Sequence, residues 1–277
     1  MGPTIAFLPG AWLTPPFYAP FLDALTTTTA LPTTPLPYPS LDPAHPATAD
    51  CQTDTAAIRT QLRTLIESAG REVILVMHSY AGMPGAAAAA TAHGLSRSAR
   101  QRAGQPGGVV GMIFIAAFLV PEGVSCAGLQ GGRLPGWILL DTGEKPAPQL
   151  NYPDDPIGNF LRPEENEDDE DDEAALSRDD LETFLRPHAT RAFTSPQPAP
   201  AWADADADAT GVAFIVTARD RAVPKEAQYA MMAATGREFA VREMDCGHCA
   251  PFVGEQRIGE TVRLVGELVR GFVSASL

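Results

Sequence analysis

The sequence predicts an α/β protein with a mostly parallel central sheet and helices on both faces. Short apolar runs alternate with helix-like stretches along the chain, which is the pattern of a parallel α/β fold. The run at 73–77 is apolar throughout, as a strand covered on both faces must be, and 109–117 and 212–217 are expected to be further buried strands. The chain has 277 residues, of which 45% are hydrophobic, so it can bury a substantial core.

The individual elements follow from local patterns. Residues 5–8 predict a first strand, and the Thr/Pro-rich segment 26–46 can hold at most a short strand at 31–36, because prolines cannot donate to a sheet. Residues 50–69 predict an amphipathic helix that ends at Gly70. The remaining expected elements are strands at 73–77, 109–117 and 212–217, a small-residue helix at 82–90, an outer strand at 237–244 and a terminal helix at 258–272.

We expect a single domain whose core comprises residues 1–120 and 210–277. The intervening segment, about 121–209, is rich in proline and scattered aromatic residues and is expected to form a lid over one end of the sheet. An independent second domain is the alternative, but the segment has no apolar core of its own. Its acidic run at 164–173 is expected to be a solvated loop, because like charges at this density repel one another.

Charge and composition limit the partners. The net charge is −14, which argues against nucleic-acid or anionic-membrane partners. Nine of these charges lie in residues 164–173, so the rest of the chain carries about −5. Four cysteines are too few for a disulfide scaffold, and neither a secretory signal nor a membrane span is recognisable. We expect a cytoplasmic protein, monomeric or homodimeric.

The sharpest chemical signal is the segment 76–82, VMHSYAG, which places Ser79 between an apolar strand and a small-residue helix. A nucleophile elbow needs this context, because the tight turn projects the serine hydroxyl above the sheet. Met77 and Ala81 stand where G-x-S-x-G has its two glycines. The alternative is a serine that only caps a helix.

Two later loops supply candidates for an acid and a base. Asp220 follows the strand at 212–217, and His248 lies in a loop ahead of the final helix. A Ser-acid-His chain order is the one expected for a hydrolytic triad in this architecture. Each residue could instead be structural. Glu122, which follows the strand at 109–117, is an alternative acid, although the sequence around Asp220 fits better.

With these motifs the sequence resembles the α/β-hydrolase superfamily, in particular compact microbial serine hydrolases and esterases. Plant methyl-ester esterases and hydroxynitrile lyases are more distant members of the same group. The resemblance covers nearly the whole chain and is weakest in the expected lid. The matching stretches are FLPGAW at 7–12, MHSYAG at 77–82, TARDRAVP at 217–224 and GHCAPF at 247–252.

The resemblance implies that Ser79 is the nucleophile, Asp220 the acid and His248 the base. The backbone N–H groups of Ala11 and Tyr80 would form the oxyanion hole. Relatives often carry histidine at the position before Gly10, where this chain has proline.

Other residues have weaker signals. Cys246 and Cys249 spell C-x-x-C, but a redox motif should follow an early strand and a zinc site would lack a fourth ligand, so we expect no metal. His78 is expected to pack or form hydrogen bonds at the elbow. Trp12, Tyr80 and Trp137 are candidates for lining an apolar acyl pocket. The remaining histidines are expected at the surface or in the lid; they are His45, His93 and His188.

The sequence therefore predicts a cofactor-independent serine hydrolase acting on a small or medium, fairly apolar ester, thioester or lactone. One alternative is a lyase that uses the same triad, as hydroxynitrile lyases do. Such lyases usually have lysine directly after the histidine, where this chain has Cys249. The other alternative is a non-catalytic ligand-binding module with a vestigial triad.

Overall fold

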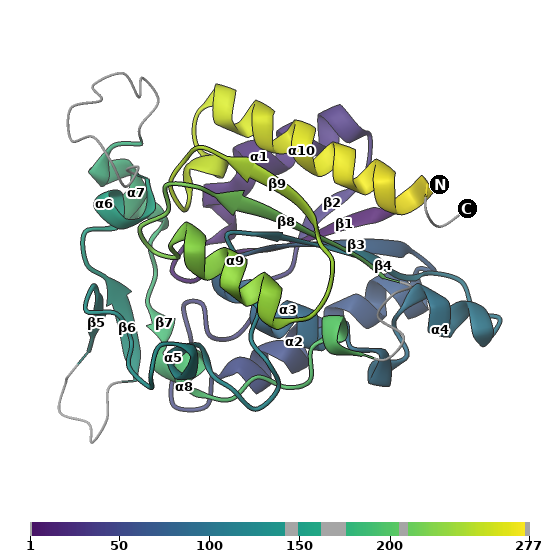
Figure 1. The fold of residues 1–277 in the computed structure, drawn as a ribbon, viewed down its shortest axis with the longest axis horizontal. Helices are drawn as coiled ribbons and strands as arrows, with labels where there is room; N and C mark the ends of the chain where they lie inside the picture. Colours follow the sequence, from purple (N-terminus) through teal and green to yellow (C-terminus); the bar gives the residue numbers. More distant parts are fainter. Residues whose placement is uncertain (1, 142–148, 162–175, 205–209, 275–277) are drawn as a thin grey trace.

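A six-stranded parallel sheet forms the centre of the protein (Figure 1). The computed structural model describes residues 2–141, 149–161, 176–204 and 210–274. The strand order is β2-β1-β3-β4-β8-β9, and each neighbouring pair is parallel. The strands are β1 (Thr4–Leu8), β2 (Thr33–Pro35), β3 (Glu72–His78), β4 (Gly108–Ile115), β8 (Gly211–Thr217) and β9 (Ala240–Met244).

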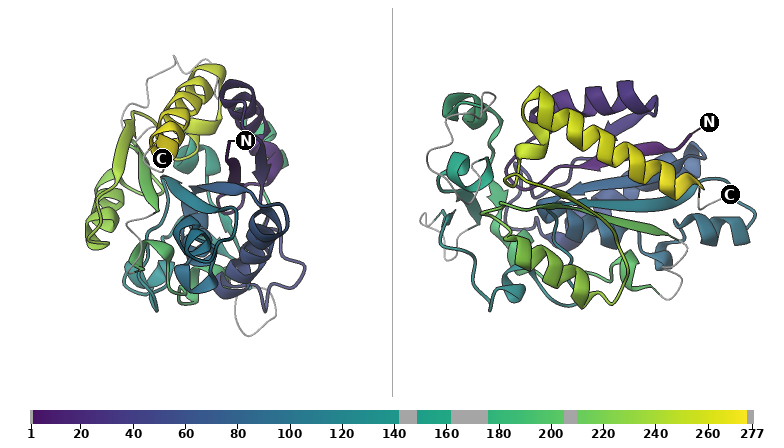
Figure 2. Two further views of the ribbon diagram at one scale, coloured as in Figure 1. Left: turned by 90° about the vertical axis from the view of Figure 1, so that its right-hand side faces the viewer. Right: turned by 45° about the horizontal axis from the view of Figure 1, so that its top comes forward.

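Helices cover both faces of this sheet, which confirms the predicted α/β class (Figure 2). On one face α1 (Ala19–Thr29) packs beside α10 (Glu255–Ser274). The other face carries α2 (Cys51–Arg63), α3 (Gly82–Ala88) and α9 (Lys225–Ala234), and the short α4 (Arg97–Arg102) lies against β4. No helix in the described part of the chain has the length and apolar character required to cross a membrane.

The central strands are buried because their side chains are apolar on both faces. Every residue of β4 is buried, as is every residue of β3 after Glu72. Helix α2 begins where expected, because Asp50 and Thr53 form a reciprocal capping box. It continues into a π-helical turn, Thr64–Ser68, and the chain leaves it through Gly70 with φ of 63°.

Helices α1 and α9, which cover the sheet, were not predicted. Helix α1 runs to Thr29, into the segment in which at most a short strand was expected. Its buried Phe21, Leu22 and Leu25 lie on one face against α10, so tertiary packing outweighs the low helix propensity of the threonines. Helix α9 was missed because its exposed side is rich in alanine, which gives little polar–apolar contrast.

The segment between β4 and β8 lies at the carboxyl end of the parallel strands (Figure 1). It contains a small antiparallel sheet in the order β5-β6-β7, and it packs against the core through Trp12, whose ring contacts Trp137, Phe160 and Phe193. The acidic run at 164–173 lies outside the described residues. The helices and strands of the segment between β4 and β8 are α5 (Cys126–Leu129), β5 (Ile138–Leu140), β6 (Leu150–Pro153), α6 (Pro156–Phe160), α7 (Arg178–Phe184), β7 (His188–Ala189) and α8 (Thr190–Thr194).

Candidate active site

Ser79 lies at the sharp turn between β3 and α3. Its φ is +53°, in the left-handed region that non-glycine residues rarely adopt. The turn tolerates Met77 at the first glycine position because its side chain lies over Gly85, where an added Cβ would approach the Met77 sulfur to 2.6 Å. Gly82 in turn lies against the backbone oxygen of Phe118. Small residues on α3 therefore let the helix start close to the sheet.

The predicted acid and base converge on this serine. Nε2 of His248 lies 2.9 Å from the Ser79 hydroxyl oxygen, and Nδ1 of His248 lies 2.7 Å from Oδ2 of Asp220. All three side chains are buried. Since Nδ1–H can only donate to the carboxylate, Nε2 presents its lone pair to the serine O–H. This arrangement can withdraw a proton from Ser79 as its oxygen attacks an electrophile.

The Asp220 carboxylate is fully buried yet well solvated by the protein. Its Oδ1 accepts hydrogen bonds from the backbone N–H groups of Ala222 and Val223 at 2.8 and 2.7 Å. Its Oδ2 accepts from the Thr217 hydroxyl at 2.7 Å in addition to the histidine. These donors replace the water that the carboxylate loses on folding, and they fix its orientation toward the imidazole.

Residues of the β1–α1 loop adjoin the serine. A Cβ added to Gly10 would come within 3.2 Å of Ser79 Cβ, so this loop and the elbow are in close contact. Ala11 follows in the same loop, and Tyr80 is the first residue after Ser79, at a helix start where N–H groups have no partner one turn earlier. The predicted donors Ala11 and Tyr80 thus lie on segments flanking the serine.

Tyrosine hydroxyls hold the β1–α1 loop at Pro9 and Gly10. The Tyr38 hydroxyl donates to the carbonyl oxygen of Pro9 at 2.9 Å, and the N–H of Gly10 donates to the Tyr18 hydroxyl at 3.0 Å. Neither tyrosine was singled out from the sequence, because no local motif links them to the loop.

His78 forms hydrogen bonds at the elbow, as predicted. Its Nδ1 lies 2.9 Å from the Tyr18 hydroxyl and its Nε2 lies 3.2 Å from the carbonyl oxygen of His248. Burial, together with the neighbouring His248, lowers the pKa of His78 well below its ordinary value, so its imidazole is neutral.

Ser79 and His248 line a small pocket of about 20 Å³. Trp12 and Trp137, both predicted to line such a pocket, belong to its wall, together with Phe193 from the inserted segment. Trp12 is held by a hydrogen bond from its Nε1 to the Asn151 side chain at 2.8 Å. The third residue predicted to line the pocket, Tyr80, is not part of its wall. Its hydroxyl instead donates to Asp54, in a separate buried cluster.

Glu122, the alternative acid, lies away from His248. It is exposed and lines a different surface cavity, together with Arg59, His93 and Gln197. The carboxylate that contacts the imidazole is that of Asp220.

A second serine–acid–histidine cluster was not predicted from the sequence. Ser40 donates to Asp54 through its hydroxyl at 2.5 Å and its N–H at 2.9 Å, and the same hydroxyl lies 3.1 Å from Nε2 of His188. His188 was expected at the surface or in the lid; it lies on β7 but is fully buried against Tyr80. His188 belongs to the segment expected to form the lid, but its contacts with Ser40 and Tyr80 were not predicted, because no local pattern links these distant residues.

The order of groups in this second cluster does not suit nucleophilic catalysis. Ser40 lies between the carboxylate and the imidazole and donates to the carboxylate, whereas a catalytic histidine must lie between serine and acid. Burial raises the pKa of Asp54 to about 6, an effect opposed by hydrogen bonds from Ser40 and Tyr80. Burial likewise lowers the pKa of His188 to about 3, which keeps it neutral.

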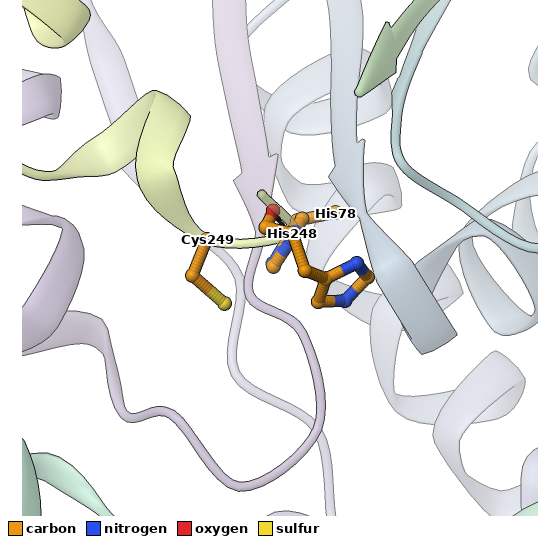
Figure 3. Close-up of side chains that lie close together, drawn as sticks. All are labelled: His78, His248 and Cys249. Atoms are coloured by element: carbon orange, nitrogen blue, oxygen red, sulfur yellow. Dashed lines mark hydrogen bonds between the residues drawn. The ribbon is translucent and has the colours of Figure 1, made fainter. Parts of the chain in front are cut away.

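Three side chains capable of metal ligation lie close together, namely His78, His248 and Cys249 (Figure 3). Their ligand atoms lie within 4.8 Å of one another. The ring nitrogens of both histidines already have the hydrogen-bond partners described above. Burial, and secondarily Asp220, raises the pKa of Cys249 well above its ordinary value, which disfavours the thiolate that a metal requires. The donor set therefore does not fit a metal site. Cys246 and Cys249 are both free and buried.

Fold and sequence together define the class of protein. Residues 5–264 match the alpha/beta hydrolase family, so the chain belongs to that family. A search of curated proteins finds no match.

Solved structures with this fold cover nearly all of the chain. A pyrethroid hydrolase from Sphingobium faniae is 18% identical, with a TM-score of 0.65, and covers 96% of this chain and 98% of its own. A methylesterase from Arabidopsis is 16% identical, with a TM-score of 0.63, and covers 95% and 99%. Tomato methylketone synthase I in complex with 2-tridecanone is 12% identical, with a TM-score of 0.68, and covers 97% and 99%. At these identities the similarity establishes the fold.

Proposed function

We propose that the protein is a serine hydrolase that cleaves a small or medium, fairly apolar carboxylic ester, thioester or lactone through an acyl-enzyme on Ser79. The observation that carries the proposal is the position of His248, with Nε2 2.9 Å from the Ser79 oxygen and Nδ1 2.7 Å from Asp220. Hydrolase and methylesterase structures with the same fold support it.

In the proposed mechanism, His248 takes the proton of Ser79 while the serine oxygen bonds to the carbonyl carbon. Asp220 holds the imidazole in the required tautomer and stabilises the imidazolium. The N–H groups of Ala11 and Tyr80 donate to the developing oxyanion, each contributing roughly 2.7–4 kcal/mol of transition-state stabilisation. The imidazolium then protonates the leaving alcohol, and a water activated by His248 releases the acid and restores Ser79.

Residues 121–209 are proposed to act as the lid of this site. Trp137 and Phe193 from this segment line the pocket at Ser79, so substrate would contact both the core and the segment. The pocket wall is largely aromatic and aliphatic, which suits an uncharged acyl or alcohol group. The free, buried cysteines fit the proposed cytoplasmic location, because disulfides are rare there.

Lyase chemistry of the hydroxynitrile type is less well supported. The residue after the histidine is Cys249, whose raised pKa keeps it neutral, so it offers no cation to hold a cyanide ion. A non-catalytic binding module would not require the hydrogen bond between Ser79 and His248.

The test is a panel of p-nitrophenyl esters assayed with the wild type, Ser79→Ala and Ser40→Ala, combined with a fluorophosphonate label located by mass spectrometry. We expect label on Ser79, and activity that Ser79→Ala reduces by roughly 10⁴-fold or more. Ser40→Ala controls for the second buried cluster and should keep the label. Labelling of Ser40, or activity that survives the loss of Ser79, would refute the proposal.

A further inference from the structure

The pocket at Ser79 is too small for the substrate class proposed above. Its volume of about 20 Å³ is that of roughly one water molecule. Large rings close one side, because Trp12, Trp137 and Phe193 belong to its wall and Trp12 packs against both of the others. An ester with an apolar substituent therefore needs space beyond this pocket.

Such space exists directly beside it. An apolar cavity of about 310 Å³ lies between α9 and the chain that follows β4. It shares four wall residues with the Ser79 pocket, namely Phe118, Gln130, Ala222 and Val223. These four residues therefore lie between the two spaces, and Ala222 and Val223 also donate their N–H groups to Asp220. The cavity therefore adjoins the side of the site that carries the acid.

The chemistry of the cavity wall selects for an uncharged, apolar group. All of its described lining residues except Gln130 have apolar side chains. Ala227, Ala230 and Ala234 lie on one exposed face of α9, and their small size creates the space. A volume of 310 Å³ lies at the lower end of the range for small-molecule sites.

One of the four residues that line both spaces, Gln130, has a side chain that can move at small energetic cost. Gln130 is exposed and follows the short helix α5. Its Nε2 contacts the Cys126 sulfur at 3.9 Å, and a hydrogen bond this long to a thiol is weak. Rotation of Gln130 would remove one of the four shared wall residues from between the two spaces without breaking a strong interaction.

We propose that this cavity binds an apolar substituent of the scissile ester, so that the carbonyl lies at Ser79 while the substituent extends past Gln130 toward α9. The proposal rests on the proposed hydrolase function and specifies its substrate class, namely esters with one uncharged aliphatic or aromatic arm about the size of a hexyl or benzyl group.

The test fills the cavity from α9. Ala230→Phe places a ring in the cavity, whereas Ala233→Phe adds the same ring at an exposed position of the same helix that does not line it. Two ester series are assayed, methyl esters with lengthening acyl chains and acetates with lengthening alcohols. In Ala230→Phe, kcat/KM for the six-carbon member of one series (methyl hexanoate or hexyl acetate), divided by kcat/KM for methyl acetate, should fall at least about tenfold relative to the wild type. That series identifies the substituent as acyl or alcohol, and Ala233→Phe should keep the wild-type ratio.

A binding measurement separates this proposal from the hydrolase function. 2-Octanone, an uncharged ketone that cannot be hydrolysed, is titrated calorimetrically into Ser79→Ala and into the same variant carrying Ala230→Phe. Weaker binding in the latter supports the cavity even if the wild type cleaves no ester, in which case the proposed function alone fails. Equal binding, an equal loss for all esters, or the same effect from Ala233→Phe would overturn the proposal.

Discussion

The Tyr18 hydroxyl lies 2.9 Å from Nδ1 of His78 and accepts a hydrogen bond from the N–H of Gly10. The carbonyl oxygen of His248, which lies 3.2 Å from Nε2 of His78, can only accept, so Nε2 carries the proton of this neutral imidazole and Nδ1 accepts from the Tyr18 hydroxyl. One buried chain of hydrogen bonds thus connects the proposed oxyanion loop to the loop of the proposed base.

Removing the Tyr18 hydroxyl should disturb both loops. In Tyr18→Phe the Gly10 N–H and His78 Nδ1 lose their partner in a buried environment, so we expect the free energy of unfolding to fall by about 1–3 kcal/mol. We also expect kcat on a short ester to fall by roughly 10–100-fold, because small displacements of catalytic groups are costly. Urea denaturation and ester hydrolysis measure the two effects.

Tyr229→Phe is the matched control, since the Tyr229 hydroxyl is exposed and bonds only to Glu243 among the described residues. It should change neither quantity appreciably. A Tyr18→Phe variant with wild-type kcat would show that the chain does not position the reacting groups.

Asp220 should be the acid whose loss matters. Asp220→Asn removes the acceptor for His248 Nδ1–H and favours the wrong tautomer, so we expect kcat to fall by roughly 10⁴-fold. Glu122→Gln changes an exposed carboxylate that lies in a different cavity and should leave kcat close to that of the wild type. Steady-state kinetics on one ester compares them, and a larger loss from Glu122→Gln would reverse the assignment.

Asp220 and Glu122 show how much of the candidate site could be predicted from the sequence. Ser79, Asp220 and His248 could be proposed from the sequence because each follows a predicted strand and carries a local motif. Since parallel strands end at the same edge of a sheet, their convergence followed from the fold class. The same reasoning left Glu122 open, since it too follows a strand, and only the positions of side chains separate the two.

The supporting residues could not be predicted in this way. Tyr18 and Tyr38 act on the β1–α1 loop through side chains that reach across the fold, and His188 reaches the core from the inserted segment. No spacing in the sequence encodes such contacts. Within the inserted segment the apolar residues also lack a clear period, because they pack on Trp12 of the core rather than on one another alone.

The buried Asp54 should make stability depend on pH in a defined direction. Its pKa is raised from 3.8 to about 6 in the folded protein, chiefly by burial. Between these values the folded state binds more protons than the unfolded state, so the free energy of unfolding falls as pH rises from about 4 to 6. Asp54→Asn lacks this loss, and its stability relative to the wild type should rise on the order of 2–3 kcal/mol across that window.

Chemical denaturation of both proteins at several pH values measures this difference. His188, whose lowered pKa acts in the opposite direction, is present in both proteins, so its contribution cancels to first order in the comparison. If the free energy of unfolding changes with pH in the same way in the wild type and in Asp54→Asn, the raised pKa of Asp54 is contradicted.

Gly82 should be the residue that allows α3 to start so close to the sheet. In Gly82→Ala the new Cβ would lie 2.5 Å from the backbone oxygen of Phe118 and 3.0 Å from Ala117 Cβ, so the elbow or the chain after β4 must shift. We expect a loss of about 1–3 kcal/mol in the free energy of unfolding, with slower fluorophosphonate labelling of Ser79. Gly259→Ala, at an exposed position of α10 where a Cβ meets no described atom within 4 Å, should instead gain about 0.5–1 kcal/mol. Because the two substitutions are chemically identical, effects of the same sign would show that close contact at the elbow does not control the outcome.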